Sequence, residues 1–204
     1  MLGVNGRGVA RVVFTPPAKV LIRLHVTADM VTIAGTLATA AAALWLFPTG
    51  HLWVGALVIG VVACGDALDG TMARLTKHST RWGAFLDSTL DRVADSAIFA
   101  GLVIYFALRG DVLGVIAAVA AGALGTVVPY ARARAEGLGM HAEGGIAERS
   151  DRLIFTLLAT FAAGVGAGRW VLVGALLVLS VAAAITVVQR MYAVWAQGAD
   201  AAAP

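Results

Sequence analysis

Four aspartates stand at helical spacing within one short stretch of the chain. Asp66 and Asp69 lie three residues apart. Asp87 and Asp91 lie four apart, and either interval places both side chains on one face of a helix. A turn between residues 74 and 83 would let the two faces oppose each other. Carboxylate oxygens with no His or Cys at ligand spacing suit a hard divalent cation, so we expect one or two Mg²⁺ ions, or Mn²⁺, in preference to Zn²⁺.

Two neighbours of these aspartates are suited to binding phosphate. Gly70 follows Asp69 directly and leaves the backbone open to close approach. Arg74 follows one turn later on the same face, where a guanidinium can donate to a phosphate. Carboxylates, a metal and an arginine together indicate phosphoryl transfer. The alternative, ion pairs between helices, is disfavoured because four carboxylates near one arginine leave a charge imbalance that a cation would remove.

The spacing of these residues matches a family signature. The chain reads D-x-x-D-G-x-x-A-R, then eight residues, then G-x-x-x-D-x-x-x-D, over residues 66–74 and 83–91. This pattern resembles that of the CDP-alcohol phosphotransferases, membrane enzymes that join a CDP-activated lipid or head group to an alcohol. The resemblance implies that Asp66, Asp69 and Asp87 hold the metal. It also implies that Asp91 is a further ligand and the catalytic general base.

A second stretch is similar to the part of the family that holds the cytidine nucleotide. It runs Thr27-Ala28-Asp29-Met30-Val31-Thr32, with alanine where the family usually has proline. The resemblance implies that CDP-diacylglycerol contacts seven residues, which are Asp29, Met30, Val31, Thr32, Gly70, Arg74 and Thr80. Helix capping is the alternative role for Thr27, Asp29 and Thr80, and the two roles are compatible.

Three arginines near the ends of different predicted spans indicate a phosphorylated acceptor. They are Arg132, Arg152 and Arg190, and each alone could be an interfacial anchor to lipid headgroups. The strings that surround them resemble the actinobacterial phosphatidylinositol phosphate synthases, a branch of this family in which the matching residues form the pocket for the acceptor's phosphate. That branch often has lysine where Arg132 stands.

The resemblance extends from about Phe14 to Trp195, which is nearly the whole chain. It implies an enzyme that transfers the phosphatidyl group of CDP-diacylglycerol to an inositol phosphate, releases CMP and forms phosphatidylinositol phosphate. It also implies a homodimer. Glycerol 3-phosphate, which would give phosphatidylglycerophosphate, stays the alternative acceptor because it too carries a phosphate. A divalent-cation channel or transporter is the alternative from another class, since carboxylates on facing membrane helices also line ion paths.

The composition indicates an integral membrane protein. Of the 204 residues, 60% are hydrophobic and only 13% are charged, with a mean hydropathy of +0.87. The 24 glycines favour close packing between helices in lipid. The net charge of +3 is explained by basic residues in cytoplasmic loops, which would face anionic lipid headgroups of the bilayer. A nucleic-acid partner is therefore not expected.

The apolar pattern predicts an all-α protein with six transmembrane helices. Each segment is near the roughly 20 residues that a helix needs to cross a bilayer, and they are expected at 30–47, 52–75, 83–108, 112–136, 151–168 and 170–194. With this topology thirteen of the fifteen Lys and Arg residues fall on one side, and only Arg109 and Arg169 on the other. The positive-inside rule then places both termini and the aspartates in the cytoplasm, with the chain in the cell membrane.

The remaining segments complete one predicted domain over residues 1–204. Residues 1–29 form a juxtamembrane segment in which residues 18–26 read as a basic amphipathic helix, with an extension of the first span as the alternative. Residues 30–194 form the six-span bundle and 195–204 the tail, whose alanine-rich end over 199–204 reads as frayed. The loop over 137–150 is expected to cover a substrate. Asp95 is expected to support the metal site or to make a polar contact, and the sequence leaves both open.

Overall fold

The structure is a computed structural model, and it describes residues 15–76, 80–142, 144–146 and 148–201. Every regular element in the described part of the chain is helical, as the apolar pattern predicts. The elements are α2 (Ala28–Leu46), α3 (Leu52–Ala63), α4 (Asp66–Thr76), α5 (Arg81–Ala107), α6 (Val112–Glu136), α7 (Arg149–Ala162), the short π-helix η1 (Ala163–Ala167) and α8 (Arg169–Ala201).

Three helices begin at side-chain caps that the sequence provides. The hydroxyl of Thr27 accepts from Met30 N at 3.2 Å at the start of α2, and that of Thr80 accepts from Gly83 N at 2.9 Å at the start of α5. Asp111 Oδ1 accepts from Gly114 N at 3.1 Å at the start of α6. Each cap satisfies a backbone N–H that has no partner inside the helix.

Four elements of the structure are long and apolar enough to cross a membrane. They are α2, α6, the α7–η1 segment over residues 149–167, and α8 as far as Gly198. Helix α3 is apolar but has only 12 residues, and α5 has 27 residues but carries Asp87, Asp91, Arg92 and Asp95 between its seventh and fifteenth positions. The expected membrane protein is therefore supported, and the count of six spans stays a prediction.

The predicted segment over residues 52–75 is not one continuous helix. The structure divides it between Ala63 and Asp66, so the prediction of an unbroken span is wrong. Gly65 N donates to Val62 O at 2.7 Å, and Leu68 N donates to Gly65 O at 2.7 Å. These three-residue bonds tighten the backbone into a turn, because glycine resists continued helix. Helix α4, which carries the first aspartate pair, is therefore a separate helix.

Both ends of the described chain differ in detail from expectation. Residues 15–23 form a separate helix, since His25 adopts a positive φ of 61° before α2 begins. This excludes an extension of the first span, and the placement of the helix on a membrane surface stays a prediction. Helix α8 continues to Ala201 through the expected tail, because alanine has the highest helix propensity.

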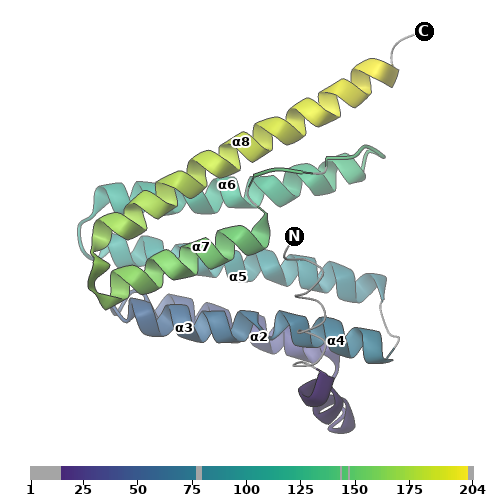
Figure 1. The fold of residues 1–204 in the computed structure, drawn as a ribbon, viewed down its shortest axis with the longest axis horizontal. Coiled ribbons are helices and arrows are strands. Elements are labelled where there is room, and N and C mark those ends of the chain that lie inside the picture. The colour runs from purple at the N-terminus through teal and green to yellow at the C-terminus, as the bar shows by residue number, and fades with distance from the viewer. Residues whose placement is uncertain (1–14, 77–79, 143, 147, 202–204) are drawn as a thin grey trace.

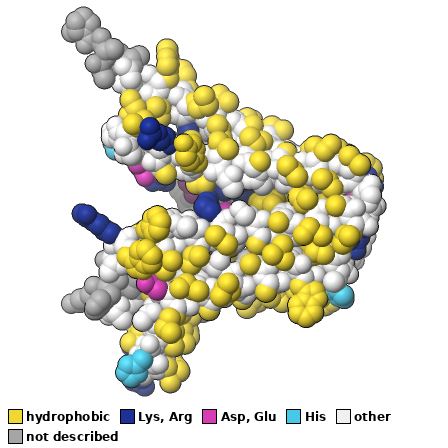
Figure 2. All heavy atoms as spheres, turned by 180° about the vertical axis from the view of Figure 1, so that it is seen from behind, with side chains coloured by type: hydrophobic (Ala, Val, Ile, Leu, Met, Phe, Trp, Pro, Cys, Tyr) yellow, Lys and Arg dark blue, Asp and Glu magenta, His cyan; other side chains and the backbone are white. Residues whose placement is uncertain are grey.

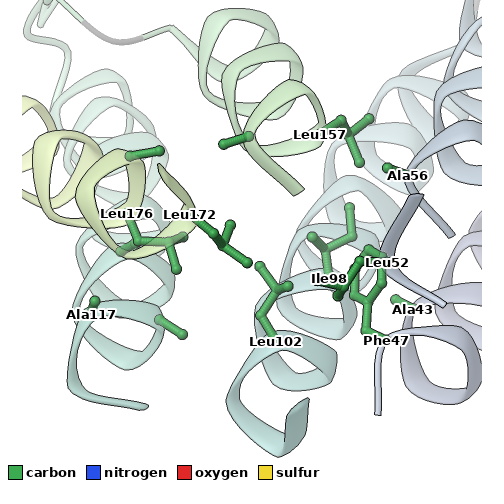
Figure 3. Packing of buried hydrophobic residues seen from close by; sticks show 14 of the residues in the cluster. Ala43, Phe47, Leu52, Ala56, Ile98, Leu102, Ala117, Leu157, Leu172 and Leu176 are labelled. Carbon is green, nitrogen blue, oxygen red and sulfur yellow. The ribbon is translucent and has the colours of Figure 1, made fainter. Parts of the chain in front are cut away.

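The helices pack around one apolar core that joins α2, α3, α5, α6, α7 and α8. Leu102 and Leu172 are fully buried and lie next to each other, and Phe47, also fully buried, lies beside Leu52 (Figure 3). A β-carbon at Gly101 of α5 would clash with the carbonyl of Ala43 on α2. This contact brings the two backbones together, as small residues do in membrane bundles, where lipid gives no hydrophobic drive.

The helices run side by side, and α8 leans away from α5 and α4 toward its C-terminal end (Figure 1). The space-filling view shows the molecule hollowed between two arms at one end, with basic and acidic side chains at the hollow and hydrophobic flanks (Figure 2). On this face, charged side chains of both signs are therefore grouped at the hollow.

Candidate active site

The aspartate motif is divided between α4 and α5, and both of these helices pack against α2. Asp66 and Asp69 lie in the first turn of α4, and their side chains are outside the described part of the structure. Asp87 is exposed on α5, whereas the side chain of Asp91, one turn further on, has an exposed fraction of only 19%. The helical spacing expected from the sequence is therefore present in both halves.

The donor set suits a hard cation. Asp87 and Asp91 share one face of α5 and supply oxygen atoms only. Among the side chains that the structure describes, no group of three His, Cys, Asp or Glu residues forms a metal cluster. The side chains of Asp66 and Asp69 lie outside that described part, so the complete four-aspartate site stays a prediction.

Two residues assigned to the nucleotide meet at the start of α5. A β-carbon built on Gly83 would lie 3.3 Å from Thr80 Oγ1 and 3.6 Å from Asp29 Oδ1. Asp29 comes from α2, so the fold brings together two elements that are about fifty residues apart. Thr27 caps α2, and Asp29 is therefore not needed for that role. Thr80 does cap α5, as the alternative reading allowed, and its contact with a nucleotide stays a prediction.

The other residues assigned to CDP-diacylglycerol lie at exposed or half-buried positions. A β-carbon on Gly70 would meet no atom within 4 Å, which agrees with open space beside this part of α4. Arg74 is exposed and donates through Nη2 to Thr71 Oγ1 at 3.2 Å. Met30 is exposed, Val31 is half-buried, and Thr32 lines a small cavity that Asp91 also lines.

The three predicted acceptor arginines line one cavity, which we name the acceptor cavity after that prediction. Arg132, Arg152 and Arg190 come from α6, α7 and α8, and the cavity they share has a volume of about 470 Å³. Arg152 and Arg190 are buried, with exposed fractions of 5% and 7%, whereas Arg132 is half exposed and pairs with Glu136 at 2.8 Å. A concave site with several convergent guanidinium groups can bind a dianionic phosphate.

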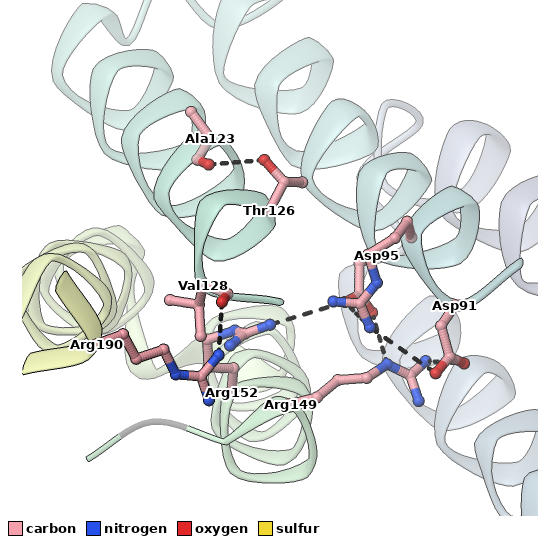
Figure 4. A network of polar contacts seen from close by, with 9 residues as sticks. Asp91, Asp95, Ala123, Thr126, Val128, Arg149, Arg152 and Arg190 are labelled. Atoms are coloured by element: carbon pink, nitrogen blue, oxygen red, sulfur yellow. Dashed lines mark hydrogen bonds and ion pairs between the residues drawn. The ribbon is translucent and has the colours of Figure 1, made fainter. Parts of the chain in front are cut away.

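Arg190 also ties the loop between α6 and α7 to the cavity. Its Nε donates to Gly144 O at 3.2 Å, and its Nη1 donates to Val128 O (Figure 4). The next loop residue, Gly145, has a φ of +135°, and a β-carbon there would clash with Thr186 of α8. The loop is therefore held closely against α8 beside the cavity, where the sequence predicted a segment that covers a substrate.

Arg149 is a site residue that the sequence analysis did not select. Its Nη2 lies 2.8 Å from Asp91 Oδ1, and its Nε lies 3.5 Å from Asp95 Oδ1 (Figure 4). Arg149 lines the acceptor cavity and also the small cavity beside Asp91, so it connects the two. The sequence feature that could have identified Arg149 is its three-residue spacing from Arg152, because this spacing places both side chains on one face of α7.

Arg92 belongs to the same network and was also missed. Its Nη2 lies 3.8 Å from Asp91 Oδ2 and 3.6 Å from Asp95 Oδ2, and it lines the acceptor cavity. Asp95 makes polar contacts with arginines, which was one of the two roles expected for it. The three-residue spacing of Arg92 and Asp95 on α5 was the available signal for their pair. No pattern within α5 identifies the partners of Asp95 on α7, because they are more than fifty residues away in the chain.

Comparison with known proteins agrees with this geometry. Residues 25–196 match the family model described as CDP-alcohol phosphatidyltransferase. The chain is 46% identical to the phosphatidylinositol phosphate synthase of Mycobacteroides abscessus, over 95% of this chain and 89% of that protein. It is 47% identical to the synthase of the same name from Cutibacterium acnes, over 89% and 92% of the two chains.

Solved structures give the same result for the fold. The Mycobacterium tuberculosis phosphatidylinositol phosphate synthase with CDP-DAG bound superposes with a TM-score of 0.84 at 42% identity, over 89% of this chain and 93% of that one. Its complex with manganese and citrate gives the same TM-score and identity, over 89% and 88% of the two chains. The matched residues include the aspartate motif and Arg132, Arg152 and Arg190, and the chain is an enzyme that belongs to the CDP-alcohol phosphatidyltransferase family.

Proposed function

We propose that this enzyme transfers the phosphatidyl group of CDP-diacylglycerol to an inositol phosphate, with CMP as the second product. One observation carries the proposal. The arginine-lined cavity adjoins Asp91 through Arg149, so a phosphate bound among the arginines would hold the rest of the acceptor near the aspartate motif. The relatives with 46% and 47% identity, both named phosphatidylinositol phosphate synthase, support the same acceptor.

The chain's own residues supply the steps of a direct displacement. Arg152 and Arg190 bind the acceptor's phosphate, and Arg149 is directed toward both that phosphate and Asp91. The carboxylate of Asp91 takes the proton of the acceptor hydroxyl. The acceptor oxygen then forms a bond to the β-phosphorus as the bond from that phosphorus to the CMP oxygen breaks. Arg74 binds the pyrophosphate beside the open face of Gly70.

Asp66, Asp69, Asp87 and Asp91 would hold one or two divalent cations, Mg²⁺ or Mn²⁺. Bound there, the metal would neutralise charge that develops on the pyrophosphate and on the departing CMP. The complex of the Mycobacterium tuberculosis relative with manganese supports a divalent cation of this class.

The membrane arrangement is part of the proposal. Six passes would place the aspartates and the arginine-lined cavity at the cytoplasmic end, together with both termini, in a cell-membrane homodimer. Arg109 and Arg169 would lie at the opposite end, where Arg169 pairs with Asp111 at 3.3 Å.

Cysteines introduced at residues 139 and 110 test the orientation, since a membrane-impermeant thiol reagent applied to intact cells should label only the second. Sedimentation in detergent tests the dimer.

A substrate panel tests the acceptor. Purified protein would receive CDP-diacylglycerol, Mg²⁺ and one acceptor, either inositol phosphate, glycerol 3-phosphate or unphosphorylated inositol, and CMP release would be measured. A charged hydrogen bond contributes roughly 1.5–3 kcal/mol, so loss of the phosphate should make free inositol a very poor substrate. We expect inositol phosphate to be converted much faster than the other two. Faster conversion of glycerol 3-phosphate would assign the alternative activity and leave the aspartate chemistry unchanged.

A further inference from the structure

We propose that Asp95 is a positioning residue that orients Arg149 and Arg152 for the acceptor's phosphate. The inference rests on the proposed function only in that the acceptor carries a phosphate. Asp95 is four residues beyond Asp91 on α5, and the two arginines come from the first turn of α7. A residue that fixes the geometry of the acceptor site would thus stand outside the aspartate motif.

Both carboxylate oxygens of Asp95 face guanidinium groups. Oδ1 lies 3.5 Å from Arg149 Nε, and Oδ2 lies 4.0 Å from Arg152 Nη2 (Figure 4). Oδ2 also lies 3.6 Å from Arg92 Nη2 on the same helix. One carboxylate is therefore the common neighbour of three arginines, and all three line the acceptor cavity.

Burial makes the charge of Asp95 important to these arginines. Its side chain has an exposed fraction of 13%, and that of Arg152 has only 6%. A guanidinium removed from water needs a nearby anion, because an unpaired buried charge is strongly unfavourable. A cavity that gathers several arginines also needs a negative charge to hold them close together while no phosphate is bound.

The geometry of a guanidinium lets Asp95 set the orientation of these arginines. A guanidinium carries five N–H donors in a fixed plane, so the direction of the donor that faces Asp95 also fixes the directions of the other four. Arg149 and Arg152 each contact Asp95 and also line the cavity. Asp95 is not among the residues that line the acceptor cavity, so it would act on a phosphate bound there through the arginines.

The variant Asp95→Asn tests this role because it keeps the size of the side chain and removes the charge. In the CMP-release assay we expect the KM for inositol phosphate to rise by on the order of tenfold or more, as for the loss of well-oriented charged hydrogen bonds. The KM for CDP-diacylglycerol should stay within about twofold, since none of the arginines that Asp95 pairs with is among its predicted contacts. Asp95→Glu should recover part of the acceptor affinity because it restores the charge.

Asp111→Asn is the matched control. Asp111 is also a buried aspartate in an ion pair, with a side-chain exposed fraction of 8% and Arg169 at 3.3 Å, but it lies at the opposite end of the bundle. Asparagine keeps the helix cap that Asp111 provides. This variant should reproduce any general effect of losing a buried charge while leaving both KM values unchanged.

Two further measurements distinguish the proposal from its alternatives. The Mg²⁺ concentration for half-maximal activity should not change in Asp95→Asn, whereas a large increase would assign Asp95 to the metal site. Calorimetric titration with inorganic phosphate should show weaker binding to Asp95→Asn than to Asp111→Asn. Equal effects on both KM values, a loss of kcat alone, or unchanged phosphate binding would overturn the positioning role. If Asp95→Asn does not fold, Asp95→Glu is tested alone: a higher KM for the acceptor with an unchanged KM for CDP-diacylglycerol would support the role, and equal increases in both KM values would overturn it.

The same assay separates a wrong acceptor from a wrong role for Asp95. If the wild-type enzyme uses glycerol 3-phosphate in place of inositol phosphate, the proposed function fails, and the effect of Asp95→Asn is then measured on the KM for glycerol 3-phosphate. A wild-type enzyme that uses only an unphosphorylated acceptor would overturn both.

Discussion

Arg149 Nη2 lies 2.8 Å from Asp91 Oδ1, so the first turn of α7 is joined to the middle of α5. The carboxylate predicted to be the general base is thereby linked to a residue of the acceptor cavity. This ion pair gives the enzyme a physical connection between the place where a phosphate can bind and the place where the acceptor hydroxyl would lose its proton.

Removal of divalent cations should abolish transfer and leave the fold intact, because the helices are held by packing and lipid whereas the carboxylates need the metal. CMP release and the far-ultraviolet circular dichroism spectrum would be measured with EDTA. Addition of Mg²⁺ or Mn²⁺ should restore activity. Full turnover in EDTA would contradict the metal assignment.

Asp91→Asn should keep CDP-diacylglycerol binding but reduce kcat by about 10²–10⁴-fold, which is typical for loss of a general base. The measurements are single-turnover CMP release and binding of the lipid nucleotide. Asp151→Asn is the control, since Asp151 is an exposed carboxylate near the site that does not line the described cavities. Near wild-type turnover in Asp91→Asn would assign the base to another group.

Arg74→Lys and Arg152→Lys should separate the two phosphate sites. Lysine keeps the charge but lacks the planar fork of a guanidinium, so each variant should lose affinity at its own site by about tenfold or more. The first should raise the KM for CDP-diacylglycerol, and the second the KM for the acceptor. Arg152 is buried, and loss of a buried partner can destabilise by about 3–5 kcal/mol, so thermal unfolding must be measured in parallel. Identical changes in both KM values would contradict the assignment.

Gly145→Ala should loosen the loop over the acceptor cavity. Its φ of +135° and the clash with Thr186 would force the backbone away from α8, with an expected strain of roughly 1–3 kcal/mol. We expect a higher KM for the acceptor and an unchanged KM for CDP-diacylglycerol. Gly139→Ala is the control, because Gly139 also has a positive φ, of +74°, but a β-carbon there would meet no atom within 4 Å. Equal effects of the two variants would show that contact with α8 is unimportant.

Local interactions explain what could be predicted about the fold. The apolar pattern located the helices because each must satisfy its own backbone hydrogen bonds, and Thr27 and Thr80 marked two of their starts. The break at Gly65 was missed, since a single glycine within an apolar run does not by itself predict a turn. The continuation of α8 to Ala201 was missed because an alanine-rich end was taken for a frayed tail, although alanine favours helix.

The sequence by itself determined the membrane character, the helical spacing of the four aspartates and the family, because composition and short-range periodicity are local properties of the chain. It also identified Arg132, Arg152 and Arg190, which the structure brings to one cavity. Only the tertiary structure decided that Arg149 reaches Asp91 and that Asp95 faces arginines of α7. Those contacts join helices far apart in sequence, and their partners are set by how the helices pack, which no local pattern encodes.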